Sequence, residues 1–231
     1  MRLDRPRPRP LTPTNSVVAW DLNAQAAIWD VARQQPNEQV RSFAIVNGAV
    51  YDAVNAIAGT PYEPYLVAPE ADGNESMDAA ASQRLNVVQT ARLFAMTDLV
   101  VADSGVACFR QKDVWSFWRP ITAIQLTDPT WTSLLVTPPF PEYPSGHACG
   151  TGARMSVYRF FFGRDDIAFS GSSVDSGTTR HFTSFSQALS ELIDARVRGG
   201  VHFPTADVEG AKLGEAVSRF ATRHHFRPLC G

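Results

Sequence analysis

The amino-acid sequence predicts an all-α protein, a helical bundle of about six or seven helices, and three observations support this class. Apolar side chains recur at the three-to-four-residue spacing of an amphipathic helix along most of the chain. The alternation of apolar and polar residues that is typical of strands is nearly absent. Prolines and glycines divide the chain into segments of helical length. Such helices bury their apolar faces against one another, which makes a bundle.

The predicted helices follow from this periodicity and from the residues that interrupt it. Pro36 breaks the first pattern, Gly163 ends a later one, and the Gly199–Gly200 pair ends the next. The segment ahead of Pro120 is predicted as a separate short helix that ends near this proline. The predicted helical segments are 17–34, 38–58, 77–103, about 104–117, 145–163, 183–198 and 207 to about 225.

Three longer segments lack helical periodicity and are predicted as loops. Residues 59–76 combine glycine, proline and acidic residues. Residues 127–144 contain five prolines together with a tryptophan, a phenylalanine and a tyrosine, which predicts an ordered loop rather than a linker. Residues 164–182 are rich in serine, glycine and threonine and are predicted to form a surface loop.

Length and composition fit one domain with a short appendage. The 231 residues are 44% hydrophobic and 19% charged, as in globular proteins. Residues 1–15 are rich in proline and arginine and are predicted to be a disordered arm, so that 16–231 form a single helical domain. The arm has no apolar stretch behind its basic residues, so it is no secretory signal as it stands; the location stays open.

Charge and hydropathy exclude several function classes. The net charge of −2 does not favour a nucleic-acid or membrane-surface partner. No run of about 18 apolar residues exists, so we expect no membrane span. The three cysteines form no C-x-x-C pair, which argues against a disulfide framework.

The segment PSGH places three residues of chemical interest at a predicted helix start. Ser145 suits the N-cap position, and Gly146 lets the backbone come close to a ligand. A helix start presents unpaired N–H groups and a partial positive charge, which suit an anion. His147 would lie in the first turn beside that anion. A helix cap followed by an incidental histidine explains the same four residues, since short matches are frequent.

Two further segments carry cations. Lys112 and Arg119 are seven residues apart and so share one helix face, which an oxyanion could neutralise; solvated side chains are the alternative. Arg196 precedes His202 by six residues, with the glycine pair between them to permit a tight turn. Arg198 is the alternative arginine, although the spacing favours Arg196.

Taken together, the ordered motifs K-x6-R-P, PSGH and R-x5-H resemble the signature of the vanadium-dependent haloperoxidases and of the related type 2 phosphatidic-acid phosphatases and bacterial acid phosphatases. FWRPITAI at 117–124 and TPPFPEYPSGHA at 137–148 resemble the bacterial haloperoxidase branch. NGAVYDAVNAI at 47–57 and HFRPL at 225–229 resemble it too. Around residues 60–90 the chain lacks helices that such relatives carry, so we expect a shortened bundle.

The resemblance implies a role for each motif residue and a vanadate cofactor held between helices. His202 would be the vanadium ligand and His147 the acid–base residue. The residues that would bind the oxyanion through charge or hydrogen bonds are Lys112, Arg119, Ser145, Gly146 and Arg196. The substrates would be hydrogen peroxide, a halide and a small organic acceptor, and a homodimer is expected by analogy only.

Three residues are expected around this set. The family often has an acid four residues beyond the ligand histidine, which orients its ring; here Asp207 lies five beyond and either keeps that role or caps the last helix. Phe109 and Phe140 lie near the motifs and either line a halide pocket or belong to the core.

Three functions follow as hypotheses. The first is a vanadate-dependent haloperoxidase that oxidises halide with hydrogen peroxide to a hypohalous-acid-type halogenating species. The second is a soluble acid phosphatase acting on phosphomonoesters, in which His202 would attack phosphorus and His147 would protonate the leaving group. The third is a shortened, non-catalytic oxyanion-binding relative. The segments FWRP and PFPEYPSGHA favour the first.

Overall fold

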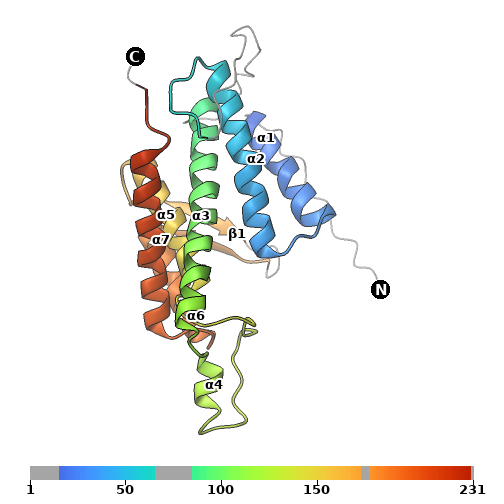
Figure 1. Cartoon of the computed structure of the whole chain (residues 1–231), viewed down its shortest axis with the longest axis vertical. Helices are drawn as coiled ribbons and strands as arrows, with labels where there is room; N and C mark the ends of the chain where they lie inside the picture. The colour runs from blue at the N-terminus through green and yellow to red at the C-terminus, as the bar shows by residue number, and fades with distance from the viewer. Residues whose placement is uncertain (1–15, 66–84, 173–176, 230–231) are drawn as a thin grey trace.

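Helices make up most of the computed structural model, which describes residues 16–65, 85–172 and 177–229 (Figure 1). The predicted all-α class is therefore confirmed. The predicted arm 1–15 and most of the predicted shortening at 60–90 lie outside the described residues. The elements are α1 Ser16–Gln25, the π-helix η1 Ala26–Val31, α2 Pro36–Ile57, α3 Val87–Trp115, α4 Pro120–Ile124, α5 Gly146–Phe162, β1 Phe169–Ser172, β2 Thr179–Phe182, α6 Phe185–Arg198 and α7 Pro204–His224.

The predicted division of the third and fourth helices is wrong, because α3 runs unbroken from Val87 to Trp115. Its start is defined by Asn86, whose side chain accepts a hydrogen bond from the Gln89 N–H at 2.8 Å. The Ser104–Gly105 pair does not interrupt it, since the Ser104 hydroxyl donates to the carbonyl of Val101 at 3.0 Å within the helix. The helix ends at Ser116, which has a positive φ of 42°.

Prolines begin three helices in this structure. For two of them, Pro36 and Pro120, the sequence had predicted the end of a preceding helix instead. Pro36 opens α2, and Pro120 opens the short α4 that the prediction lacked. Pro204 opens α7 three residues before its predicted start at Asp207. At the first helical position a backbone N–H would have no partner within the helix, so proline loses nothing by lacking one. The fixed φ of proline also suits the helix.

A small hairpin corrects the prediction of a plain loop at 164–182. Strands β1 and β2 pair antiparallel, with Phe169 opposite Phe182. The two rings lie 5.0 Å apart between centroids, and Phe169 also contacts Phe185 at the start of α6. This aromatic contact anchors the hairpin on the bundle. The sequence did not predict it, because the segment is rich in serine and glycine and lacks clear strand alternation.

Helices α3, α5 and α7 form the centre of the bundle, and α1 and α2 flank α3 (Figure 1). The main core cluster joins Met96 and Val100 of α3 to Val157 of α5 and Ala221 of α7, all buried. The predicted helix 17–34 corresponds to α1 and η1, which contribute Val17 to this core. Among the described residues no helix combines the length and apolarity needed to cross a membrane.

Glycines let α5 and α7 approach each other backbone to backbone. A Cβ placed on Gly210 would lie 2.6 Å from the carbonyl oxygen of Ser145, and one on Gly152 would lie 2.6 Å from that of Ala211. A Cβ on Gly214 would overlap the carbonyl of Cys149. Real side chains essentially never come so close, so only glycine permits this contact. The contact fixes the first turn of α5 against α7.

We expect Gly214→Ala to lower the free energy of unfolding by about 1–3 kcal/mol, because α5 and α7 must separate to admit the methyl group. Gly105→Ala on α3 is the matched control, since nothing lies within 4 Å of its added Cβ. That control should gain roughly 0.5–1 kcal/mol from helix propensity. Urea unfolding followed by circular dichroism measures both. Equal midpoints for the two variants would contradict the close approach.

Candidate oxyanion site

The predicted site residues converge where the ends of α3 and α6 meet the starts of α5 and α7. Electrostatic effects connect them: the pKa of His147 responds to Lys112, Arg119, Arg196 and His202 alike. They come from separate places in the chain, namely the last turn of α3 (Lys112), the segment before α4 (Arg119), the start of α5 (Ser145, Gly146, His147), the end of α6 (Arg196) and the loop before α7 (His202).

Lys112 is fully buried, and its ammonium group holds the proline-rich loop. Nζ donates to the carbonyl oxygens of Pro141 at 2.8 Å, Glu142 at 3.0 Å and Pro144 at 2.5 Å. These three acceptors use all three N–H donors of the ammonium group. Burial lowers the pKa of Lys112, and the neighbouring charge of Arg119 lowers it further. Its first contribution is therefore to position the loop that leads into Ser145.

Contrary to the prediction from their spacing, Arg119 does not share a helix face with Lys112, because α3 ends at Trp115 and Arg119 lies in the extended segment before α4. It is nevertheless buried, and it ties the proline-rich loop to the segment before α7. Nε donates to the carbonyl of Phe140 at 3.1 Å, and Nη1 donates to the carbonyl of Val201 at 2.7 Å. Nη1 also lies 3.2 Å from Nε2 of His202. A guanidinium has only donors, so Nε2 of His202 must be the acceptor in this contact.

Glu142 fixes the orientation and tautomer of His202. Its Oε1 lies 2.8 Å from Nδ1 of His202, and both side chains are almost completely buried. Because Nε2 accepts from Arg119, the ring proton is on Nδ1 and is donated to Glu142. The backbone N–H of Phe203 donates to the same oxygen at 2.9 Å. Burial lowers the pKa of His202, which favours this neutral form.

The sequence analysis missed Glu142 and left open whether Asp207 orients the His202 ring or caps the last helix. The structure gives that contact to Glu142, three residues before Ser145 in the segment PEYPSGH. The available signal was a carboxylate inside a proline-rich loop beside a cation cluster. Asp207 instead lies fully buried in the first turn of α7. A local spacing rule could not distinguish the two acids, because the contact with Glu142 spans 60 residues of chain.

Arg196 and Asp207 both keep buried polar atoms without well-formed hydrogen bonds. The Nε of Arg196 and both carboxylate oxygens of Asp207 have no partner in good geometry among the described residues. Burial raises the pKa of Asp207, whereas the nearby Ser145 hydroxyl and the Arg196 charge lower it. A buried guanidinium donor without an acceptor is costly, and an oxyanion would satisfy it. The donor set therefore fits an anionic ligand.

The start of α5 has the geometry predicted from PSGH. Ser145 is the N-cap: its hydroxyl accepts from the Ala148 N–H at 3.4 Å, and its own N–H donates to the carbonyl of Ala206 at 2.9 Å. Gly146 packs against the Lys112 stem, with an added Cβ only 3.9 Å from Cε. The N-terminus of α5 thus faces the cations, where its partial positive charge adds to theirs.

His147 is the site residue whose protonation is most affected. Its surroundings lower the pKa from the usual 6.5 to about 4, through burial on its protein side and through Arg196, His202, Arg119 and Lys112. The ring still remains accessible to solvent. At neutral pH and without an anion, His147 is therefore uncharged and can accept a proton.

The predicted turn before His202 and the predicted aromatic residues also have clear positions. Gly200 has a φ of 73°, and an added Cβ would lie 2.9 Å from the Trp131 ring, so this turn requires glycine. Phe109 and Phe140 are 5.3 Å apart between ring centroids. Phe140 lies beneath Lys112 Nζ at 5.3 Å and the Arg119 guanidinium at 5.2 Å. The phenylalanine pair thus forms an aromatic wall beside the cations.

We expect His147 to titrate with a midpoint near 4 in the anion-free protein. Inorganic phosphate should raise this midpoint, because a bound anion offsets the positive field that disfavours the imidazolium form. Proton NMR of the histidine rings, assigned with the spectrum of His147→Ala, measures both values. A titration midpoint of 6.5 for His147 that does not change when phosphate is added would contradict the described electrostatics.

Comparison with known proteins identifies the family to which the chain is related. The family described as the VCPO second helical-bundle domain matches residues 92–231, more than half of the chain. A vanadium chloroperoxidase from Curvularia inaequalis is 34% identical over 130 residues, which cover 48% of this chain and 21% of that protein.

Solved structures show the same fold. A bacterial vanadium-dependent iodoperoxidase superposes with a TM-score of 0.58 at 24% identity, and the match covers 96% of this chain and 53% of that chain. The apo form of a bacterial vanadium-dependent chloroperoxidase gives 0.55 at 18% identity, covering 95% and 52%. The chain therefore spans about half the length of these solved relatives. Because the model of the family's second helical-bundle domain matches more than half of the chain, the chain belongs to the vanadium-dependent haloperoxidase family.

Proposed function

We propose that the chain is a vanadate-dependent haloperoxidase, which oxidises halide with hydrogen peroxide to a hypohalous-acid-type species. One observation carries this proposal: Glu142 holds His202 as the Nδ1–H tautomer, so that the Nε2 lone pair lies among fixed cations. This lone pair accepts a hydrogen bond from Arg119 Nη1, and it becomes available to a ligand when a bound oxyanion takes over that Arg119 donor. A neutral imidazole nitrogen beside oxyanion-binding charges is what a vanadate ion requires of its protein.

The residues that would hold vanadate fit its shape and charge. His202 Nε2 would be the ligand atom, and the Arg196 Nε donor now lacks an acceptor. Arg119 and the N-terminus of α5 at Ser145 and Gly146 would add charge and hydrogen bonds. Lys112 would contribute mainly its charge, because its ammonium donors already hold three carbonyls. When bound, vanadate would supply the Lewis acid that activates hydrogen peroxide toward halide.

His147 would handle protons at this site. Its neutral form can take a proton from incoming hydrogen peroxide, and the imidazolium can return a proton to a leaving oxygen. The bound oxyanion favours the imidazolium by offsetting the cations, which moves the pKa of His147 up from about 4 toward working pH. The Phe109–Phe140 wall offers an apolar boundary for a halide and a small organic acceptor.

The phosphatase alternative uses the same lone pair. Nε2 of neutral His202 could attack phosphorus, with His147 protonating the departing alcohol. The third alternative is a non-catalytic oxyanion-binding relative. It is supported by the finding that the chain spans only about half the length of the solved relatives. These alternatives differ in their chemistry and so are separable by assay.

We expect the purified chain reconstituted with orthovanadate to brominate a phenol-red-type dye in the presence of hydrogen peroxide and bromide. A parallel assay omits vanadate and follows hydrolysis of a chromogenic phosphate monoester. His202→Ala should abolish bromination and vanadate binding, because it removes the ligand atom. Ester hydrolysis without bromination would establish the phosphatase instead. Failure of both reactions in a folded protein that still binds vanadate would establish the non-catalytic relative.

We expect Arg196→Ala to weaken orthovanadate binding by about 1.5–3 kcal/mol, the range of a hydrogen bond to a charged group. Arg198→Ala is the matched control on the same helix, since that side chain is 80% exposed and forms an ion pair with Asp194 at 3.7 Å. The control should bind vanadate as the unaltered chain does. Calorimetric titration measures both variants, and a larger loss from Arg198→Ala would reassign the site arginine.

A further inference from the structure

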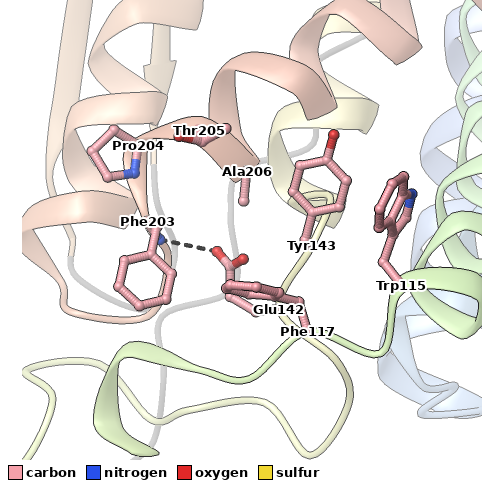
Figure 2. A pocket seen from close by; sticks show the side chains of 8 residues that line it. All are labelled: Trp115, Phe117, Glu142, Tyr143, Phe203, Pro204, Thr205 and Ala206. Carbon is pink, nitrogen blue, oxygen red and sulfur yellow. Dashed lines mark hydrogen bonds between the residues drawn. The ribbon is translucent and has the colours of Figure 1, made fainter. Parts of the chain in front are cut away.

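A pocket of about 540 Å³ shares Glu142 with the oxyanion site, and none of the site's cations lines it. Figure 2 shows the side chains that line this pocket. None of its lining residues is a lysine, an arginine or a histidine. Its walls come from the end of α3, the proline-rich loop and the start of α7. The lining residues are Trp115, Phe117, Glu142, Tyr143, Phe203, Pro204, Thr205 and Ala206.

Four aromatic rings line this pocket in two edge-to-face pairs. Trp115 and Tyr143 have centroids 5.8 Å apart with an interplanar angle of 82°, and Phe117 and Phe203 are 6.1 Å apart at 77°. Trp115 is 60% exposed and Phe117 is 47% exposed. Large aromatic surfaces left open around one hollow are typical of a ligand site. Their electron-rich faces also attract cations.

Glu142 supplies the charge of this pocket, and half of its carboxylate is unused. Both hydrogen bonds that the carboxylate accepts, from His202 Nδ1 and from the Phe203 N–H, go to Oε1. Oε2 accepts no hydrogen bond from the described residues. The side chain is only 1% exposed, so bulk water cannot fully solvate this oxygen. Figure 2 shows the carboxylate among the aromatic and α7 side chains that line the pocket.

A second carboxylate, Glu209, lies near Tyr143 and is paired with Lys212. Glu209 and Glu142 both raise the pKa of Tyr143, after burial, and Lys212 opposes them. Lys212 forms an exposed ion pair with Glu209 at 2.8 Å, so these two charges largely offset each other and Glu142 is the carboxylate that lines the pocket. The pocket therefore combines an apolar aromatic wall with a carboxylate oxygen that accepts no hydrogen bond from the described residues, and no cation lines it. Such a surface is complementary to an apolar molecule that carries one positive charge and an N–H donor.

We propose that this pocket binds a primary organic ammonium ion, an alkyl- or arylalkylamine in its charged form. The ammonium group donates a hydrogen bond to Oε2 of Glu142, and the apolar part of the amine packs among Trp115, Phe117 and Phe203. The inference does not rest on the haloperoxidase proposal, because it uses no residue of the oxyanion site except the shared carboxylate. An amine is also repelled by Arg119 and Arg196, so it does not compete for the oxyanion position.

The test compares 2-phenylethylammonium with 2-phenylethanol, which keeps the shape and one hydrogen-bond donor but has no charge. Calorimetric titration of the full chain at neutral pH should show the amine binding roughly tenfold or more tightly than the alcohol. Saturating orthovanadate should not displace the amine. Equal affinities for the two probes, or displacement by vanadate, would overturn the proposal.

Three variants locate the binding position. Glu142→Gln should weaken the amine roughly tenfold and leave the alcohol unchanged, and Phe117→Leu should weaken both probes. Phe220→Leu is the matched control, because Phe220 is 62% exposed on α7 and does not line the pocket. Amine binding that survives Glu142→Gln, or is lost in the control, would contradict this position. If Glu142→Gln fails to fold, the two-probe comparison on the unaltered chain still decides the matter.

Discussion

The burial of the Lys112 ammonium group under three backbone carbonyls is the constraint on which the site depends. A buried charge without partners would be costly, so the loop 141–144 must close over it with its carbonyls turned inward. That closure delivers Ser145 to the start of α5 and places Glu142 in the interior. Loss of the lysine would therefore affect the helix start and the histidine contact together, as well as the charge.

The second constraint is the close contact between α5 and α7. Gly210, facing the backbone of Ser145, and Gly214, facing Cys149, bring the first turn of α5 onto α7. The hydrogen bond from the Ser145 N–H to the Ala206 carbonyl completes this contact. The N-terminus of α5 and the buried Asp207 are thereby held beside the segment that carries His202. Small residues at this interface thus serve the site as well as the core.

Electrostatics distinguish the proposed anion position from the proposed cation position beside it. On one side of Glu142, burial together with the charges of Arg196 and Arg119 lowers the pKa of His147. On the other side the aromatic pocket contains no cation in its lining. Glu142 separates the two environments, with Oε1 committed to His202 and Oε2 unpaired. The oxyanion position is therefore lined by cations, whereas the neighbouring aromatic pocket is not.

The sequence by itself determined the helical class and most helix positions, because helical periodicity and caps are local properties. The seven-residue spacing of Lys112 and Arg119 did not place them on one helix, because α3 ends at Trp115. Spacing alone could not reveal that α3 is continuous, since a Ser–Gly pair is compatible with either outcome. Only the tertiary structure decided that Glu142, rather than Asp207, orients His202. That contact depends on the path of a loop without periodicity, and this path is set by the distant Lys112 and Arg119.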